Sequence, residues 1–343
     1  MSLYCPIPFD DPDRVLMAHG GGGLMTARLI ESIFYPAFGG SAEAAHDGYV
    51  FDVDGGRMAC TTDSFVVKPL FFPGGDIGDL AVNGTVNDIA CCGARPLVLT
   101  AGFILEEGLL LTDLRRIAAS MGRAAAKAGV RIVAGDTKVV ERGRCDGLYI
   151  NTTGIGVVDK GVDIAPGRAS AGDVVICSGE IGLHGIAIMS ERDGLGFDSA
   201  LESDTAALNT LVAALIGGTG DIHVLRDPTR GGVAATLNEI ALASAVHIAI
   251  DEESLPIPQP VRTAAALLGL DPLYIANEGV MLVILPGRYA ADALRIMHSL
   301  PEGRMARVIG QVEAGRPSVR LNTPYGGSRV IDMPLGEQLP RIC

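Results

Sequence analysis

Short apolar runs separated by turn-forming residues recur along the whole chain, and they predict strands. Most of these runs are rich in β-branched residues or alternate apolar with polar positions, which is typical of half-buried strands. They cover residues 49–53, 58–62, 131–134, 148–158, 174–178, 247–250, 280–285 and 318–321. Sheet structure is therefore expected in both halves of the chain.

Between these runs, apolar residues recur at helical spacing. The clearest case is 112–129, where Leu114, Ile117, Met121 and Ala125 fall on one stripe and Gly129 is placed to end the helix. Further helices are predicted at 25–34, 79–90, 204–216, 231–245, 260–268 and 290–300. Strands followed by helices and then by strands favour an α+β fold of mixed α/β layers over a sandwich or a bundle.

Turn formers mark a join between two domains. Residues 159–172 contain the fewest large apolar side chains and many turn formers, so we place the domain boundary there. This division predicts an N-terminal domain of residues 1–160 and a C-terminal α/β domain of residues 161–313. The remaining segment, 314–343, is expected to be a tail with little core of its own.

Composition and charge narrow the class of protein. The 343 residues are 48% hydrophobic, which supplies enough core for two domains, and the net charge of −13 comes without any basic run. A nucleic acid or an anionic membrane would be repelled, and no apolar stretch approaches the length of a membrane span. The seven cysteines lack a CxxC pair, which suits neither a disulfide framework nor a zinc site. We expect a cytoplasmic protein whose cysteines are mostly reduced and buried.

Four aspartates lie where strands or loops give way to turns or helices. They are Asp63, Asp88, Asp136 and Asp227. Each one alone is more simply explained as a turn former or a helix cap. Four such contexts in one chain instead suggest converging carboxylates, whose charge would be neutralised by Mg²⁺, a cation that takes carboxylate ligands together with phosphate oxygens.

Glycines and arginines supply candidate phosphate ligands. Residues Gly20, Gly21, Gly22 and Gly23 precede the first predicted helix and can bring backbone amides against phosphate, although they can equally be a flexible arm. Arg226 and Arg230 flank Asp227, either to bind phosphate or to pair with that carboxylate. Neither a Walker P-loop nor a Rossmann glycine motif occurs, so any nucleotide is held in another way.

Three further residues are candidates for catalysis. Lys138 and Glu278 stand in apolar surroundings, as a proton-transfer couple or as a structural ion pair. The chain ends in Cys343, a thiol that is either incidental or a substrate carried on a tether. The seven residues after Gly336 reach about 23–25 Å when extended, far enough to carry the thiol from an internal site to a partner.

Taken together, these segments resemble one family nearly from end to end. The motifs are AHGGGG (18–23), TTDSFVV (61–67), PLFFPGGDIG (69–78), GTVNDIA (84–90), IVAGDTKVV (132–140), RDPTRGG (226–232), ANEG (276–279) and GEQLPRIC (336–343). They are similar to the HypE family of hydrogenase maturation proteins, within the superfamily of aminoimidazole ribonucleotide synthetase and selenophosphate synthetase. The terminal PRIC is particular to HypE, whereas the other blocks resemble the ATP and Mg²⁺ site of the superfamily.

The resemblance implies a reaction. A HypF-like carbamoyltransferase would carbamoylate Cys343, and ATP would drive dehydration of the S-carboxamide to an S-cyanate, with ADP and phosphate as the other products. The cyano group would pass to iron on a HypC-HypD complex, on the way to the [NiFe] hydrogenase centre. The resemblance also implies the two-domain fold of aminoimidazole ribonucleotide synthetase, with N-terminal halves that pair in a homodimer.

The same resemblance implies roles for individual residues. Glu278 would be the base and Lys138 its positioning or relaying partner. The remaining assignments are to Mg²⁺ for Asp63, Asp88 and Asp227, and to nucleotide for Gly20, Gly21, Gly22, Gly23, Asp76, Asp136, Thr137 and Arg230.

Two alternatives remain. A selenophosphate synthetase would carry a lysine shortly after an N-terminal cysteine or selenocysteine, but the first lysine here is Lys68. A non-catalytic carrier would use its terminal thiol to hand over metal or sulfur, with ATP as a switch. A lone thiol without His or Cys neighbours is a poor metal site.

Overall fold

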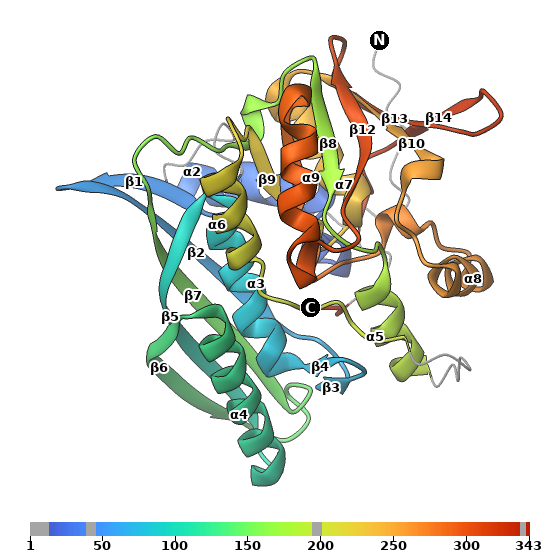
Figure 1. Ribbon diagram of the computed structural model, residues 1–343. Coiled ribbons are helices and arrows are strands. Elements are labelled where there is room, and N and C mark those ends of the chain that lie inside the picture. The colour runs from blue at the N-terminus through green and yellow to red at the C-terminus, as the bar shows by residue number, and fades with distance from the viewer. Residues whose placement is uncertain (1–13, 39–45, 194–200, 337–340) are drawn as a thin grey trace.

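Two large sheets with helices packed on them form most of the structure, and a third sheet consists only of β3 (Phe71–Phe72) and β4 (Gly75–Asp76). In the computed structural model, residues 14–38, 46–193, 201–336 and 341–343 are described. The first sheet is formed by strands between residues 49 and 158, and the second by strands between residues 173 and 331 (Figure 1). Only a short 3-10 turn, Pro166–Arg168, lies between them. The structure is therefore built of mixed α/β layers, as predicted.

The first sheet has five strands in the order β1-β2-β7-β5-β6. Its strands are β1 (Tyr49–Val53), β2 (Gly56–Phe65), β5 (Ala94–Glu106), β6 (Arg131–Val140) and β7 (Leu148–Val158). All neighbours are antiparallel except β5 and β6, which run parallel because helix α4 (Leu111–Ala128) connects them. Helix α4 ends at Gly129 with a φ of 71°, a left-handed conformation that glycine adopts without strain. This confirms the predicted helix and its end.

Helix α3 (Ile77–Cys91) lies between the first sheet and the rest of the molecule (Figure 1). It is buried on nearly all sides, which explains why its residues read as apolar with few polar positions. Asp76 caps its N-terminus by accepting hydrogen bonds from the backbone of Gly78 and Asp79. Because Asp88 lies in the last turn, the helix carries one predicted metal ligand at the end opposite Asp76.

The second sheet has seven strands in the order β14-β13-β10-β12-β8-β11-β9. Its strands are β8 (Asp173–Cys177), β9 (Val224–Arg226), β10 (His247–Asp251), β11 (Leu282–Pro286), β12 (Arg307–Glu313), β13 (Ser318–Asn322) and β14 (Ser328–Ile331). The helices of this half are α5 (Leu183–Asp193), α6 (Asn209–Gly218), α7 (Gly232–Ser244), α8 (Gln259–Leu268) and α9 (Ala290–His298). Buried strands such as β11 carry continuous apolar runs because both faces are covered.

Several local predictions were wrong. The helix predicted at 204–216 begins only at Asn209, because the preceding residues are hydrogen-bonded to other elements. Asn87, for example, accepts a hydrogen bond from the Leu208 amide at 2.8 Å. The longest strand, β5, was not predicted, since Pro96 and Gly102 interrupt its apolar pattern. Strands β9, β12 and β14 were also not predicted.

The N-terminal segment packs on the C-terminal half. It consists of α1 (Leu24–Leu29), a π-helical turn (Ile30–Phe34) and α2 (Tyr35–Phe38), where one helix was predicted. The backbone amides of Leu24 and Met25 donate to the carbonyls of Pro334 and Leu335 at 3.0 and 3.4 Å. The glycines that precede α1 are thereby brought to the C-terminal half.

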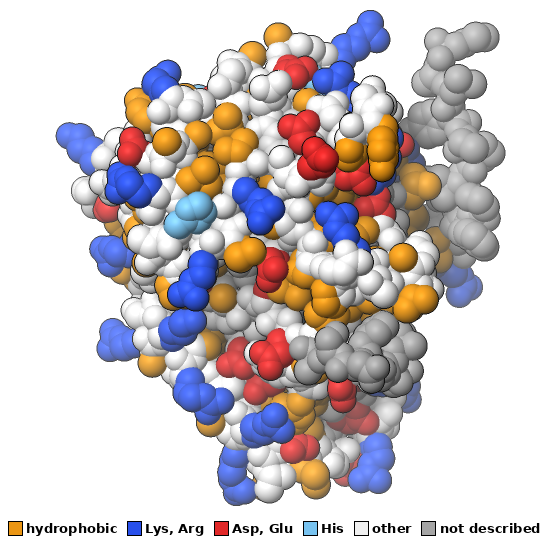
Figure 2. All heavy atoms as spheres, turned by 45° about the vertical axis from the view of Figure 1, so that its right-hand side comes forward, with side chains coloured by type: hydrophobic (Ala, Val, Ile, Leu, Met, Phe, Trp, Pro, Cys, Tyr) orange, Lys and Arg blue, Asp and Glu red, His pale blue; other side chains and the backbone are white. Residues whose placement is uncertain are grey.

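The distribution of charged side chains and the lengths of the helices describe the molecule further. Acidic and basic side chains are interspersed over the face shown in Figure 2, which has no continuous basic patch. Among the described residues, every helix is too short or too polar to cross a bilayer.

Candidate active site

Three of the predicted metal ligands come together between the two halves. Asp63 lies near the end of β2, Asp88 in the last turn of α3, and Asp227 directly after β9. The Thr61 hydroxyl donates to Asp88 Oδ2 at 2.9 Å. Burial, followed by the charges of Asp227 and Asp63, raises the pKa of Asp88 well above its usual range. Burial also raises the pKa values of Asp63 and Asp227, so the cluster is short of positive charge.

Asp47 joins this cluster, although it was not among the predicted site residues. Arg226 Nε lies 2.8 Å from Asp47 Oδ2, and Arg226 Nη2 lies 2.7 Å from Glu239 Oε2. Arg226 thus has a structural role, but its ion-pair partners are Asp47 and Glu239 and not Asp227 as considered from the sequence. Burial alone would raise the pKa of Asp47, but Arg226 together with His46 and Cys91 outweighs burial, and the pKa is lowered. Asp47, Cys91 and Asp227 offer ligand atoms within 4.8 Å of one another.

Glu278 lies beside the aspartates with its carboxylate buried. The residue is 3% exposed, and its Oε1 atom has no hydrogen-bond partner among the residues that the structure describes. Burial first, and then the charges of Asp227, Asp204 and Asp63, raise its pKa well above the usual value, with Arg230 opposing them. An unpartnered buried carboxyl group facing other acids is costly, so the position suggests a cation or substrate that complements it.

The backbone around Glu278 is held tightly. The Asp204 carboxylate accepts hydrogen bonds from the amides of Glu278 and Gly279 at 3.1–3.2 Å. The Glu278 carbonyl accepts from the Ala206 amide at 3.3 Å. A Cβ atom at Gly279 would lie 1.7 Å from the Asp204 carbonyl oxygen, so only glycine fits there. These contacts fix the backbone position of Glu278, from which its side chain extends.

The glycine segment lies against Arg230. Gly22 has a φ of 73°, and a Cβ atom on it would lie 3.0 Å from Arg230 Cβ. A Cβ atom on Gly23 would lie 2.4 Å from the Pro334 carbonyl oxygen, whereas Gly20 has open space around it. Burial raises the pKa values of Asp63 and Glu278, and the positive charge of Arg230 opposes that rise at both residues. The structure therefore brings the glycines, Arg230 and the acidic cluster to one place.

Other predicted residues do not join the cluster within this chain. Asp136, Thr137 and Lys138 lie on β6, the edge strand of the first sheet. Lys138 Nζ lies 2.6 Å from Asp136 Oδ2, with both side chains about 70% exposed, so the pair considered between Lys138 and Glu278 is not formed. Asp76 is buried as the cap of α3, where Ser120 also donates to it.

The last three residues are docked in the interior, contrary to the expectation of a tail without core. Ile342 and Cys343 are 1% and 8% exposed, and both belong to the apolar cluster that includes Ile275 and Ala276. The Val66 amide donates to the Cys343 carbonyl at 3.1 Å, and the Lys68 amide to the Arg341 carbonyl at 3.4 Å. The C-terminus thus lies between the two halves (Figure 1). Residues 337–340 lie outside the described residues.

Lys138 lines a cavity that also includes Val66, a residue bonded to the docked end. The cavity has a volume of about 340 Å³, and Val66, Asp136, Lys138 and Asn151 are among its lining residues. The Val66 amide donates to the Cys343 carbonyl, so Val66 links the docked end to this cavity, whose lining among the described residues includes neither the tail nor the acidic cluster.

The cysteines agree in part with the expectation of buried, reduced side chains. Cys91, Cys92, Cys177 and Cys343 are buried, whereas Cys60 and Cys145 are partly exposed. All six are free thiols, and Cys5 lies outside the described residues. Burial raises the pKa of Cys91 well above its ordinary value, so this thiol is protonated where it touches Asp227.

Comparison with known proteins gives two family-model matches and many relatives. Residues 45–158 match the N-terminal domain of AIR synthase related proteins, and residues 170–322 match the C-terminal domain. The carbamoyl dehydratase HypE of Azotobacter vinelandii is 50% identical over 331 residues, which are 96% of this chain and 97% of that protein.

Solved structures agree with these matches. The chain is similar, with a TM-score of 0.84 and 50% identity, to a chain in the crystal structure of a HypE-HypF complex, over 89% of this chain and 99% of that one. It is similar to a HypE hydrogenase maturation protein in complex with ATP, with a TM-score of 0.82 and 48% identity over 96% and 100% of the two chains.

Proposed function

The chain belongs to the HypE carbamoyl dehydratases among the AIR synthase related proteins, and from this premise we propose how its residues perform the reaction. The enzyme uses ATP to dehydrate a carboxamide and so supplies the cyanide ligand of the [NiFe] hydrogenase centre. We assign the carboxamide to the sulfur of Cys343. The observation that carries this assignment is the docking of Cys343 in the interior of its own chain, where its carbonyl accepts a hydrogen bond from the amide of Val66, three positions after Asp63.

The chemistry requires a better leaving group than the amide oxygen. The carboxamide oxygen attacks the γ-phosphorus of ATP, ADP departs, and one N–H proton is removed. Loss of the second N–H proton then forms the carbon–nitrogen triple bond as the carbon–oxygen bond breaks and phosphate leaves. The net change is removal of one water from the carboxamide, with ATP converted to ADP and phosphate.

The acidic cluster fits a divalent cation. Burial and mutual repulsion raise the pKa values of Asp63, Asp88 and Asp227, as expected of carboxylates that await a positive charge. Mg²⁺ held by these three side chains would neutralise charge on the phosphate oxygens of ATP. The glycine segment and Arg230 lie beside the cluster and offer backbone amides and a guanidinium for the same phosphates.

Glu278 is the base in this scheme. Its raised pKa brings a carboxylate closer to the range in which it accepts a proton from a weakly acidic N–H group. The contacts of Asp204 with the Glu278 backbone keep the side chain in place during the reaction. Lys138 lines a cavity that also includes Val66, the residue whose amide bonds the Cys343 carbonyl, and its role in this scheme is to position the carboxamide or relay a proton.

We assign the remaining nucleotide contacts to a homodimer. Asp136, Thr137 and Asp76 are remote from the acidic cluster of their own chain, so their nucleotide role depends on a second protomer that brings its first sheet close. Strand β6 is suited to this because it is a long edge strand with exposed apolar side chains, including Val133 and Val139 at 52% and 67% exposure. The assignment gives residues 1–160 to ATP binding and dimerisation, 161–313 to the C-terminal α/β domain, and 314–343 to the segment that ends in Cys343.

A charged residue on β6 should therefore break the dimer. We expect Val139→Lys to shift the protein from dimer to monomer in light scattering at micromolar concentration, because like charges would face each other across the pairing edge. Leu267→Lys is the matched control, since Leu267 is 74% exposed on α8 in the other half of the molecule. A Val139→Lys protein that stays dimeric would rule out pairing through β6.

The partners follow from the same reaction. A HypF-like carbamoyltransferase supplies the carboxamide, in keeping with the HypE-HypF complex known for a relative, and a HypC-HypD complex accepts the cyanide. The need for ATP and for a reduced Cys343 thiol supports a cytoplasmic reaction.

The two alternatives predict other products. A selenophosphate synthetase-like enzyme would need selenide, and an ATP-switched carrier would leave the carboxamide intact. ATP-dependent loss of one water from carbamoylated Cys343 tests the assignment against both.

A further inference from the structure

His184 connects the docked tail to another part of the molecule. It lies in the first turn of α5 and is fully buried. Its Nε2 atom lies 3.0 Å from the carbonyl oxygen of Ile342, and its Nδ1 atom lies 2.8 Å from the Ser203 hydroxyl. The ring packs edge-on against Phe72 with centroids 5.6 Å apart. Its position is therefore set on three sides.

The hydrogen-bond partners determine the tautomer of His184. A carbonyl oxygen can only accept, so Nε2 carries the proton and donates to Ile342. Nδ1 then accepts from the hydroxyl of Ser203. Burial lowers the pKa of His184 to about 4, so the ring is neutral at physiological pH and one donor and one acceptor are available.

Ser203 begins a path that ends at Glu278. Its oxygen accepts a hydrogen bond from the Thr205 amide at 3.1 Å, which shapes the turn around Asp204. The Asp204 carboxylate accepts from the Glu278 amide at 3.2 Å. The tail carbonyl and the backbone of Glu278 are thus attached to the same short segment, residues 203–206, from two sides.

We propose that His184 is the positioning residue of the C-terminal tail, and that segment 203–206 aligns the docked tail with Glu278. The alignment of the tail with Glu278 rests on the proposed function, whereas the role of His184 in docking the tail does not. The Ile342 carbonyl belongs to the residue next to the thiol, so a hydrogen bond there sets the depth at which Cys343 enters.

An ion pair between Arg341 and Asp146 also holds the tail, but it is more exposed to solvent than the contact of His184. Arg341 Nη2 lies 2.5 Å from Asp146 Oδ2, but the two side chains are 27% and 23% exposed. Solvent and salt weaken an ion pair of this kind, and its long side chains are less well ordered than a buried imidazole. The Arg341 contact therefore adds affinity for the tail, whereas His184 sets its register.

The docking test uses alkylation of Cys343 in the full chain without ATP or partner. Wild-type Cys343 should react slowly with iodoacetamide, as followed by the mass of the C-terminal peptide. His184→Phe keeps the ring shape but removes the donor, and should raise the rate roughly tenfold, about the upper range for one hydrogen bond. His184→Gln, which retains an N–H donor at similar reach, should react at a rate closer to wild type.

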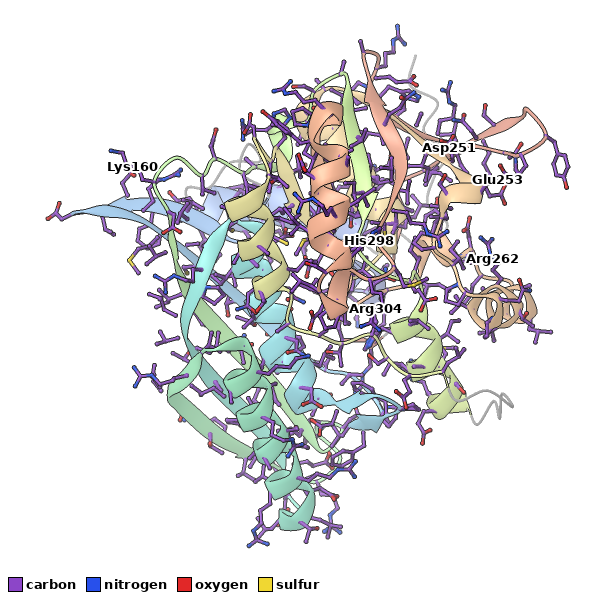
Figure 3. All side chains as sticks on the ribbon, in the orientation of Figure 1. Lys160, Asp251, Glu253, Arg262, His298 and Arg304 are labelled. Atoms are coloured by element: carbon purple, nitrogen blue, oxygen red, sulfur yellow. The ribbon has the colours of Figure 1, made fainter. Side chains whose placement is uncertain are left out.

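Two controls separate positioning from general damage. His298 on α9 donates Nε2 to the Ala306 carbonyl at 2.8 Å, so His298→Phe removes the same kind of bond at a histidine whose partner is Ala306 and not the tail (Figure 3). It should leave the alkylation rate of Cys343 unchanged. If His184→Phe does not fold, Ser203→Ala serves instead, since it removes the hydroxyl that fixes the tautomer and should raise the rate severalfold.

The alignment test uses carbamoylated protein in a single turnover with saturating ATP. His184→Phe should slow dehydration about tenfold or more while the dissociation constant for ATP stays unchanged. An alkylation rate for His184→Phe equal to that of wild type overturns the docking role. Faster alkylation with an unchanged turnover rate overturns the alignment with Glu278. Failure of the wild type itself to dehydrate would refute the proposed function and leave the docking result standing.

Discussion

Glu278→Gln should abolish dehydration while ATP binding is retained. Loss of a general base costs about 10²–10⁴-fold in rate, and the amide of glutamine cannot take the proton from the carboxamide nitrogen. The backbone contacts to Asp204 involve the Glu278 amide and not the side chain, so they persist in the variant. Single-turnover rates and ATP titrations would measure the two effects separately.

The free energy of unfolding of Glu278→Gln distinguishes a loss of the catalytic base from a loss of folded protein. A carboxyl group with a raised pKa in the folded state costs stability above its unfolded pKa, and this cost grows as the pH rises toward the folded value. Since burial raises the pKa of Glu278, glutamine removes that cost, and the free energy of unfolding at neutral pH should not fall. Glu253→Gln, at an exposed position, is the control (Figure 3). Dehydration by Glu278→Gln at the wild-type rate would remove the base assignment.

Asp88→Asn should have opposite effects on function and stability. Asparagine still accepts the hydrogen bond from Thr61, but it supplies no charge to Mg²⁺. We expect dehydration to fall by about 10²-fold or more, the range seen when preorganised electrostatic stabilisation is lost. In the ligand-free protein, the variant should unfold at a higher temperature than wild type. The reason is that the charge of Asp88 is repelled by Asp227 and Asp63.

Thermal unfolding of the wild type and of Asp88→Asn, with and without Mg²⁺, tests the metal assignment directly. Mg²⁺ with ATP should stabilise the wild type against thermal unfolding far more than Asp88→Asn, because only the folded wild type binds the cation well. Asp251→Asn is a matched control, since Asp251 accepts a side-chain hydrogen bond from Asn322 at an exposed position (Figure 3). Equal stabilisation of Asp88→Asn and wild type would contradict the metal assignment.

Most of the fold could be predicted from strong local patterns of apolar residues and turn formers in the sequence. Helix α4 was placed almost to the residue, because its apolar stripe and Gly129 agree. Strand β5 was missed where Pro96 and Gly102 weaken the pattern, although pairing on both sides holds it as a strand. The helix predicted from 204 began late, since Asp204 is tied to Glu278 by contacts that are distant in sequence. Tertiary hydrogen bonds overrode local propensity there.

The site could be predicted where residue type and context agreed. Asp63 and Asp88 lie near the ends of β2 and α3, Asp227 directly follows β9, and the structure brings the three together. Asp47 and His184 were missed because each stands alone in an unremarkable segment, and only the folded chain places one at Arg226 and the other at Ile342. The burial of the last residues was also missed, since no sequence pattern identifies the groove that receives them.

The most direct measurement is the mass of the C-terminal peptide after one turnover. Chain carbamoylated at Cys343 would be mixed with Mg²⁺ and ATP, quenched and cleaved, with a nonhydrolysable ATP analogue as the control. The account predicts that ATP, and not the analogue, lowers the mass of the modified peptide by one water, with one ADP formed for each peptide changed. ADP formation with the carboxamide mass unchanged would contradict it.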